Sequence, residues 1–186
     1  SASSAMLRDA RERYRVPVIE VIQPAVRKAV SATRNGHVGV IGTHATVTSG
    51  AYEDAFAAAT HIDLTTSACP RFVEFVEAGI TMSDELLECA KEYLAPIIER
   101  GCDTLVLGCT HYVFAQEVLR PLAGPGVQLI ETGQPVARQT RRLLQGAGLL
   151  ASHAPLASDA ALRLLAARDM DLLRAAAARW LQLPAD

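Results

Sequence analysis

A cysteine, a threonine and a histidine follow one another where an apolar run of the sequence ends. The apolar residues 105–107 lead into Gly108, and Cys109, Thr110 and His111 come directly after it. This pattern predicts a strand that runs into a helix, with Cys109 at the helix N-terminus. Free N–H groups, the helix dipole and a protonated His111 would all stabilise a thiolate at that point.

The same segment would also suit a bound carboxylate. The N–H groups of Thr110 and His111, with the Thr110 hydroxyl, are the donors that a helix N-terminus offers to an anion. The alternative is that Cys109 is a small buried apolar side chain with no chemistry, as many cysteines are. The residue types alone leave both interpretations open.

Further polar residues follow other predicted strands. Thr43 and Thr46 come after the apolar run that ends at Gly42, and a glycine there lets a ligand approach the backbone. An ordinary turn with capping hydroxyls explains the same pattern equally well. Glu77 ends a predicted short helix, so its carboxylate either orients His111 or is simply solvated. The segment lacks the glycine pattern and lysine of a nucleotide-binding loop, which argues against a nucleotide.

The remaining cysteines and histidines give weaker signals. Cys69 ends a predicted strand and either lines the same rim or packs in the core, with packing favoured. Cys89, inside a predicted helix, and Cys102, at the start of a predicted strand, are expected to be structural. The four thiols show no disulfide or zinc spacing. The other histidines also lack metal-ligand spacing, so we expect no metal site: His37, His44, His61 and His153.

Composition sets limits on the class of protein. The chain has 186 residues, with 18 Lys and Arg against 20 Asp and Glu, for a net charge of −2. This balance argues against a partner such as nucleic acid. With 50% hydrophobic and 20% charged residues, the chain is expected to be globular. No apolar stretch approaches the ~20 residues that cross a bilayer, and charges occupy the place of a signal peptide's apolar region. We therefore expect a cytoplasmic protein without a membrane partner.

Helical and strand patterns alternate along almost the whole chain. Alternation of this kind predicts a parallel sheet covered by helices, that is, a three-layer α/β sandwich. In such sheets ligands bind beyond the carboxyl ends of the strands, where the polar residues above lie. The predicted strands cover 16–22, 37–43, 61–68, 102–108 and 126–132. The predicted helices cover 3–14, 24–33, 46–59, 70–77, 83–100, 109–122, 134–145 and 158–183.

Four segments together resemble the glutamate racemase family: VGVIGTHATVTSGAY (38–52), ACPRFVEFVEAG (68–79), DTLVLGCTHY (103–112) and QLIETG (128–133). The resemblance covers most of residues 1–145 and implies a cofactor-independent enzyme that supplies D-glutamate for peptidoglycan. It implies two similar α/β domains that face each other across a cleft, each with one catalytic cysteine. One thiolate removes the substrate's α-proton, and the other thiol returns a proton to the opposite face.

The resemblance also implies roles for residues that the pattern had already singled out. It identifies Cys109 as the family's second catalytic cysteine, with His111 and Glu77 as catalytic neighbours and His111 also touching substrate. It implies substrate contacts from Thr43 or Thr46 and from Thr110. Ser1 would correspond to the substrate-binding threonine of the family's Cys-Asn-Thr-Ala-Ser motif, so the first cysteine would precede Ser1. The chain alone is therefore not expected to complete a two-base reaction.

The resemblance implies a domain division as well. Residues 23–132 would form one complete four-stranded α/β domain that carries Cys109, and residues 1–22 and 133–186 would be parts of a second, similar domain. The predicted strand 16–22 would then have an unpaired edge, and such an edge favours association. A homodimer is one expected assembly. Val113, where the family usually has proline, is a small departure.

Three hypotheses about function stay open at this stage. The first is a glutamate racemase, which the run 68–79 favours. The second is a related racemase or isomerase whose substrate is aspartate, a hydantoin or maleate. The third is a non-catalytic α/β module that binds an amino acid, or a protein partner, without removing the α-proton.

Overall fold

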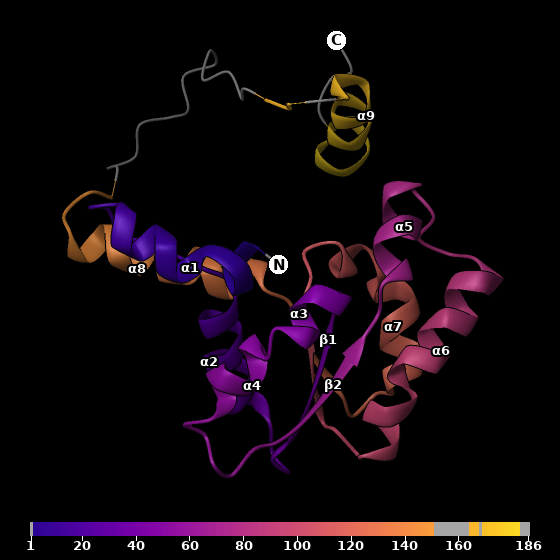
Figure 1. Cartoon of the computed structure of the whole chain (residues 1–186). Helices are drawn as coiled ribbons and strands as arrows, with labels where there is room; N and C mark the ends of the chain where they lie inside the picture. Colours follow the sequence, from indigo (N-terminus) through magenta and orange to yellow (C-terminus); the bar gives the residue numbers. More distant parts are fainter. Residues whose placement is uncertain (1, 151–163, 168, 183–186) are drawn as a thin grey trace. The chain divides into compact units, whose positions relative to one another are not determined.

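The computed structural model describes residues 2–150, 164–167 and 169–182 (Figure 1). It divides into two compact units, Ser1–Gly148 and Leu149–Asp186. The first unit contains the sheet and most of the helices. The second contains α9 (Met170–Leu181), which begins where the Asp169 carboxylate accepts the N–H of Leu172 at 3.2 Å.

Four parallel strands form the sheet within the described residues, in the order β2-β1-β3-β4. Their bounds are β1 (His37–Gly42), β2 (Asp63–Ala68), β3 (Thr104–Leu107) and β4 (Gln128–Ile130). Val40 of the central strand β1 pairs with Thr66 on one side and Val106 on the other. Because all strands run in one direction, their carboxyl ends share one edge, as the sequence predicts.

Helices cover both faces of the sheet, which makes three layers and confirms the predicted α/β fold (Figure 1). One face packs on α2 (Ile22–Ala32) and α4 (Ala51–Phe56), the other on α5 (Arg71–Glu77), α6 (Asp84–Glu99) and α7 (Gln116–Ala123). Alternate strand residues face opposite ways, so Val106 belongs to the first core and Leu105 and Leu107 to the second. The remaining helices of the first unit are α1 (Ala2–Arg13), α3 (His44–Thr48), α8 (Gly133–Gly146) and the 3-10 helix η1 (Tyr112–Ala115). None of the helices in the described part of the chain is long and apolar enough to span a bilayer.

The strand predicted over 16–22 is wrong. Residues 14–21 are irregular, and α2 begins at Ile22 because the Glu20 carboxylate accepts the N–H groups of Ile22 and Gln23 at the start of that helix. Pro17 also removes a donor that a sheet would need. The unpaired strand edge that we expected there is therefore absent from the described residues.

Three predicted helices are interrupted. The helix over 46–59 is divided into α3 and α4 because Gly50 adopts a left-handed φ of 65°, and Thr43 caps α3. The helix over 109–122 begins instead as a turn followed by η1, and the first α-helical residue is Gln116. Of the helix over 158–183, residues 158–163, 168 and 183 lie outside the described part and 164–167 are not helical.

The predicted domain boundaries near Gln23 and Thr132 stay predictions. All four strands of the described sheet lie between these positions, but the compact unit itself extends from Ser1 to Gly148.

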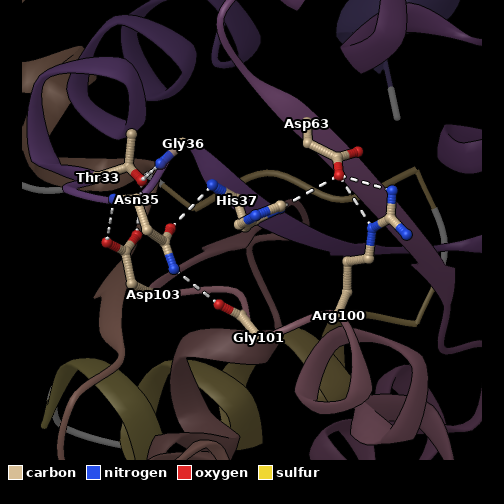
Figure 2. A network of polar contacts seen from close by, with 8 residues as sticks. All are labelled: Thr33, Asn35, Gly36, His37, Asp63, Arg100, Gly101 and Asp103. Carbon is tan, nitrogen blue, oxygen red and sulfur yellow. Dashed lines mark hydrogen bonds and ion pairs between the residues drawn. The ribbon is translucent and has the colours of Figure 1, made fainter.

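A network of polar contacts joins the loops at the amino ends of the strands (Figure 2). The Asp103 carboxylate accepts hydrogen bonds from the Thr33 hydroxyl at 2.6 Å, the Arg34 N–H at 2.7 Å and the Asn35 N–H at 3.0 Å. Beside it, the Asp63 carboxylate lies 2.7 Å from the guanidinium of Arg100. These contacts fix the edge of the sheet opposite to Cys109, so we assign them a structural role.

We expect Asp103→Ala to lower the free energy of unfolding by about 2 kcal/mol at pH 7, because four donors, the Thr104 hydroxyl among them, lose a charged acceptor. Burial alone would raise the pKa of Asp103, but these hydrogen bonds hold it at about 2, below its ordinary 3.8. The carboxylate therefore contributes fully above the unfolded-state pKa and loses its contribution as the pH falls through about 4 toward 2. Urea unfolding at pH 7 and pH 3 measures this, with exposed Glu92→Ala as the control. An equal difference at both pH values would contradict the role.

Candidate active site

The loops after β1, β2 and β3 are tied together at the carboxyl edge of the sheet. The N–H of Gly108 donates to the carbonyl of Ile41 at 2.7 Å, and the N–H of Cys69 donates to the carbonyl of Gly42 at 2.8 Å. These bonds continue the sheet pairing beyond the last strand residues. The loop that begins at Cys109 is therefore held next to the loops that begin at Thr43 and Cys69.

Cys109, His111 and Glu77 form a chain of contacts at this edge. The Cys109 sulfur lies 3.7 Å from His111 Nδ1, and His111 Nε2 lies 3.5 Å from a Glu77 oxygen. The sequence left open whether Glu77, at the end of α5, faces His111 or is solvated; its carboxylate lies near His111, and its side chain is 57% exposed. Cys109 is half-buried, whereas Cys69, Cys89 and Cys102 are buried. Of the four thiols, that of Cys109 is thus the one within reach of a ligand.

The residues predicted to bind substrate through a hydroxyl differ in how accessible they are to a ligand. Thr43 Oγ1 lies 2.9 Å from Thr46 Oγ1 and accepts the Thr46 N–H at 3.3 Å, so this pair caps α3, as the alternative interpretation held. Thr46 is 1% exposed, which keeps its side chain from a ligand, whereas Thr43 is half-buried. Thr110 is exposed on the loop that carries Cys109. Ser1 lies outside the described residues. Substrate contacts from these residues stay predictions.

The electrostatic environment of Cys109 differs from the one we expected. Burial raises the pKa of the thiol above its ordinary value, and hydrogen bonds from the backbone N–H groups of His111 and Tyr112 offset this only in part. The predicted lowering is wrong because no α-helix begins at Cys109: a turn and a 3-10 helix follow β3. The sequence had suggested that the backbone N–H of His111 binds a carboxylate. Because this N–H donates to the Cys109 sulfur, it is not free to do so. At neutral pH the thiol is mainly protonated.

This environment predicts how Cys109 reacts with an alkylating agent. Only the thiolate is nucleophilic, so the alkylation rate of Cys109 by iodoacetamide should rise about tenfold per pH unit between pH 7 and 9. Mass spectrometry of the peptide that carries Cys109 measures the rate, and the buried Cys102 serves as the slow internal comparison. A rate that stops rising below pH 8 would show a lowered pKa and contradict the description above.

The other thiols pack in the core. Cys69 is fully buried, its sulfur lies 3.6 Å from the Ser67 carbonyl, and burial raises the pKa of its thiol to about 12. This confirms packing and excludes an exposed rim position. Cys89 and Cys102 are buried as expected. Within the described ranges no three His, Cys, Asp or Glu side chains are grouped as metal ligands.

Two tyrosines that the sequence analysis missed hold the Cys109 loop. The Tyr112 hydroxyl donates to the carbonyl of Cys69 at 2.7 Å, which fastens the turn to the end of β2. The Tyr52 ring lies against Gly108: a Cβ added at Gly108 would come within 3.1 Å of that ring and 2.7 Å of the Ile41 carbonyl. The apolar strand that ends in glycine is the signal that indicates this close packing.

Comparisons with known proteins show what the chain is similar to. The sequence model of the family described as Asp/Glu/Hydantoin racemase matches residues 1–140. The glutamate racemase of Acidothermus cellulolyticus is 72% identical over 149 residues, which are 80% of this chain and 57% of that protein. The glutamate racemase of Mycobacterium tuberculosis is 54% identical over 153 residues, 82% of this chain and 56% of that protein. The chain thus spans little more than half the length of these curated relatives.

Solved structures give the same result for the fold. The glutamate racemase isoform RacE1 from Bacillus anthracis matches with a TM-score of 0.85 and 29% identity, over 98% of this chain and 67% of that one. The glutamate racemase of Francisella tularensis, solved in complex with D-glutamate, matches with a TM-score of 0.75 and 28% identity, over 82% of this chain and 57% of that one.

Proposed function

Because the chain belongs to the Asp/Glu/hydantoin racemase family, we propose that it is part of a glutamate racemase and that Cys109 is one of the two bases of the reaction. The observation that carries this proposal is the chain of contacts from Glu77 through His111 to the Cys109 sulfur. It supplies a nucleophilic atom, a proton acceptor beside it and a carboxylate that orients the acceptor, all at the edge where α/β sheets bind ligands.

The arrangement defines a role for each of the three residues. The Glu77 carboxylate lies 3.5 Å from His111 Nε2 and favours the proton on that nitrogen, which leaves Nδ1 as the ring nitrogen with a free lone pair facing the sulfur. His111 then takes the thiol proton and Glu77 stabilises the resulting imidazolium. The Cys109 thiolate removes the α-proton of the substrate. A thiolate of raised pKa is scarce, but each one formed is a stronger base toward a weakly acidic C–H.

The second base comes from another part of the enzyme. Cys69, Cys89 and Cys102 are buried, so none of them can face a substrate that Cys109 touches. In the complete reaction one thiolate takes the α-proton, and the thiol on the opposite face of the α-carbon gives another, so the enantiomers of glutamate interconvert without a cofactor.

The names of the relatives favour glutamate as the substrate. The curated relatives named above are glutamate racemases, and the Francisella relative is described with D-glutamate bound. In our proposal the Thr43 and Thr110 hydroxyls bind the substrate's carboxylates. The product serves peptidoglycan precursor synthesis, which places the reaction in the cytoplasm. A homodimer stays a prediction.

Isotope exchange tests the substrate. The chain is incubated in D₂O with the enantiomers of glutamate and, separately, of aspartate, and the α-proton is followed by NMR. We expect exchange with glutamate at least about tenfold faster than with aspartate, since a site fitted to the longer side chain places the α-carbon of the shorter one poorly. Faster exchange with aspartate would favour a related racemase. Glutamate binding without any exchange would favour the non-catalytic module.

A further inference from the structure

Tyr52 of α4 lies directly behind the loop that carries Cys109. The residue is 2% exposed and belongs to the core between α2, α4 and the sheet. Of its ring atoms, Cε2 and Cζ lie nearest to Gly108, at 3.1 and 3.3 Å from the place that a Cβ on that glycine would take. Because Cζ bears the hydroxyl, the polar end of the ring is the part that reaches this loop.

The Tyr52 hydroxyl is a buried donor without a hydrogen-bond acceptor among the described residues. The contrast with Tyr112 is informative, because that buried hydroxyl donates to the carbonyl of Cys69 at 2.7 Å. An unsatisfied buried hydroxyl lowers the stability of the fold. A phenylalanine would fill the same space without this cost, so the hydroxyl needs another explanation.

Two acidic groups lie close enough to Tyr52 to affect its ionisation. Burial raises the pKa of the phenol most, and the charges of Glu20 and Cys109 raise it further. The hydroxyl therefore keeps its proton and can act only as a donor toward an anion. Both carboxylate oxygens of Glu20 already accept N–H groups at the start of α2. The Cys109 sulfur accepts the backbone N–H groups of His111 and Tyr112, but these only partly offset its burial, so its thiolate is the anion that a further donor would stabilise.

We propose that the Tyr52 hydroxyl is a reserve donor for Cys109, which hydrogen-bonds to the sulfur when the thiol loses its proton and thereby stabilises the thiolate. Tyr52 is then a positioning residue that acts through Cys109 and does not touch the substrate. The unsatisfied hydroxyl lowers the stability of the fold while the Cys109 thiol is protonated. When the thiolate forms, the same hydroxyl donates a hydrogen bond to it. The consequence for proton transfer rests on the proposed function, but the effect on the thiol itself does not.

The other ionisable groups near Cys109 are the same in wild type and in a variant of Tyr52. His111 faces the sulfur and is paired with Glu77, while Tyr112 is committed to the Cys69 carbonyl. The Cys69 thiol is buried, and its raised pKa keeps it neutral. A change at Tyr52 can therefore be measured at Cys109 without altering the His111 and Glu77 pair.

The test is the pH dependence of Cys109 alkylation by iodoacetamide in wild type and Tyr52→Phe, resolved by mass spectrometry. Loss of one hydrogen bond to the thiolate should raise the midpoint of the curve of alkylation rate against pH by about one pH unit. At a fixed pH below this midpoint, alkylation of Cys109 should therefore be about tenfold slower. The melting temperature should stay equal or rise by a few degrees, since the lost hydroxyl has no acceptor in the resting protein.

Tyr112→Phe is the matched control, because it removes the other buried hydroxyl near Cys109. It should lower the melting temperature and leave the midpoint of Cys109 within about 0.3 units, well below the shift that one charged hydrogen bond gives. An unchanged midpoint in Tyr52→Phe, or an equal shift in both variants, would overturn the inference. So would a clear loss of stability in Tyr52→Phe. Neither measurement uses glutamate, so failure of the proposed racemase activity would be seen separately, in the exchange experiment.

Discussion

Replacing Cys109 by alanine is expected to reduce α-proton exchange from glutamate by about 10⁴-fold, to the background rate. The reason is that the other thiols of the chain, at Cys69, Cys89 and Cys102, are buried and none can take over the proton transfer. His111 and Glu77 remain in the variant, but without the sulfur they have no group to activate. NMR in D₂O measures the residual rate.

Cys102→Ala is the control for this substitution. It also removes one thiol, but Cys102 precedes β3 and lies at the opposite end of that strand from Cys109. We expect exchange within a factor of about two of the wild-type rate. Removing one small buried side chain far from Cys109 disturbs only its own neighbours and leaves the site unchanged. Exchange that survives in Cys109→Ala would show that another group is the base.

Gly108→Ala is the second substitution with a large expected effect. An added Cβ would lie 2.7 Å from the Ile41 carbonyl, which is backbone of the central strand and cannot move aside. The variant must break the hydrogen bond from the Gly108 N–H to that carbonyl or displace the Tyr52 ring. We expect a loss of about 3 kcal/mol in the free energy of unfolding. Exchange should fall as well, because Cys109 is the next residue and a displacement of about 1 Å misplaces the base.

Gly126→Ala provides the comparison for Gly108→Ala. Nothing lies within 4 Å of a Cβ placed at Gly126, so this variant should unfold within about 0.5 kcal/mol of wild type. Urea unfolding measures both variants. Equal stability of Gly108→Ala and Gly126→Ala would show that the loop before Cys109 is not held against β1 as described.

The sheet and the position of Cys109 follow from the sequence. The runs over 37–43 and 102–108 are short and apolar and are flanked by turn residues, and both are confirmed as β1 and β3. Parallel strands then put the residues that follow each of them at one edge, which brought Cys109 and His111 to the predicted place. The helix predicted over 83–100 is confirmed as α6, where the Ser83 side chain accepts the N–H of Leu86 as the N-cap and the apolar period continues from it.

The errors arise where an alternating apolar pattern lacks a tertiary partner or where local turns compete with a helix. The segment 16–22 has the residues of a strand, but the described sheet offers it no partner, and Glu20 caps α2 instead. After Cys109, hydrogen bonds between residues three apart, such as the one from Tyr112 N–H to the Cys109 carbonyl, replace the expected helix. The acidity of the thiol was misjudged for this reason, since the predicted effect depended on a helix N-terminus.

The contact between Tyr52 and Gly108 was beyond sequence reasoning. Fifty-six positions separate the two residues, and only the packing of α4 against the end of β3 brings them together. The helix predicted over 46–59 includes Tyr52, but the pattern says nothing about its unsatisfied hydroxyl.

The central claim is that Cys109 acts as a base on one face of the α-carbon of glutamate. The most direct measurement follows the α-proton of L-glutamate and of D-glutamate separately in D₂O, and records the optical configuration of the product. The account predicts that the chain exchanges the α-proton of one enantiomer without inversion, and that Cys109→Ala stops this exchange. Absence of exchange from both enantiomers, under conditions in which glutamate binds, would contradict it.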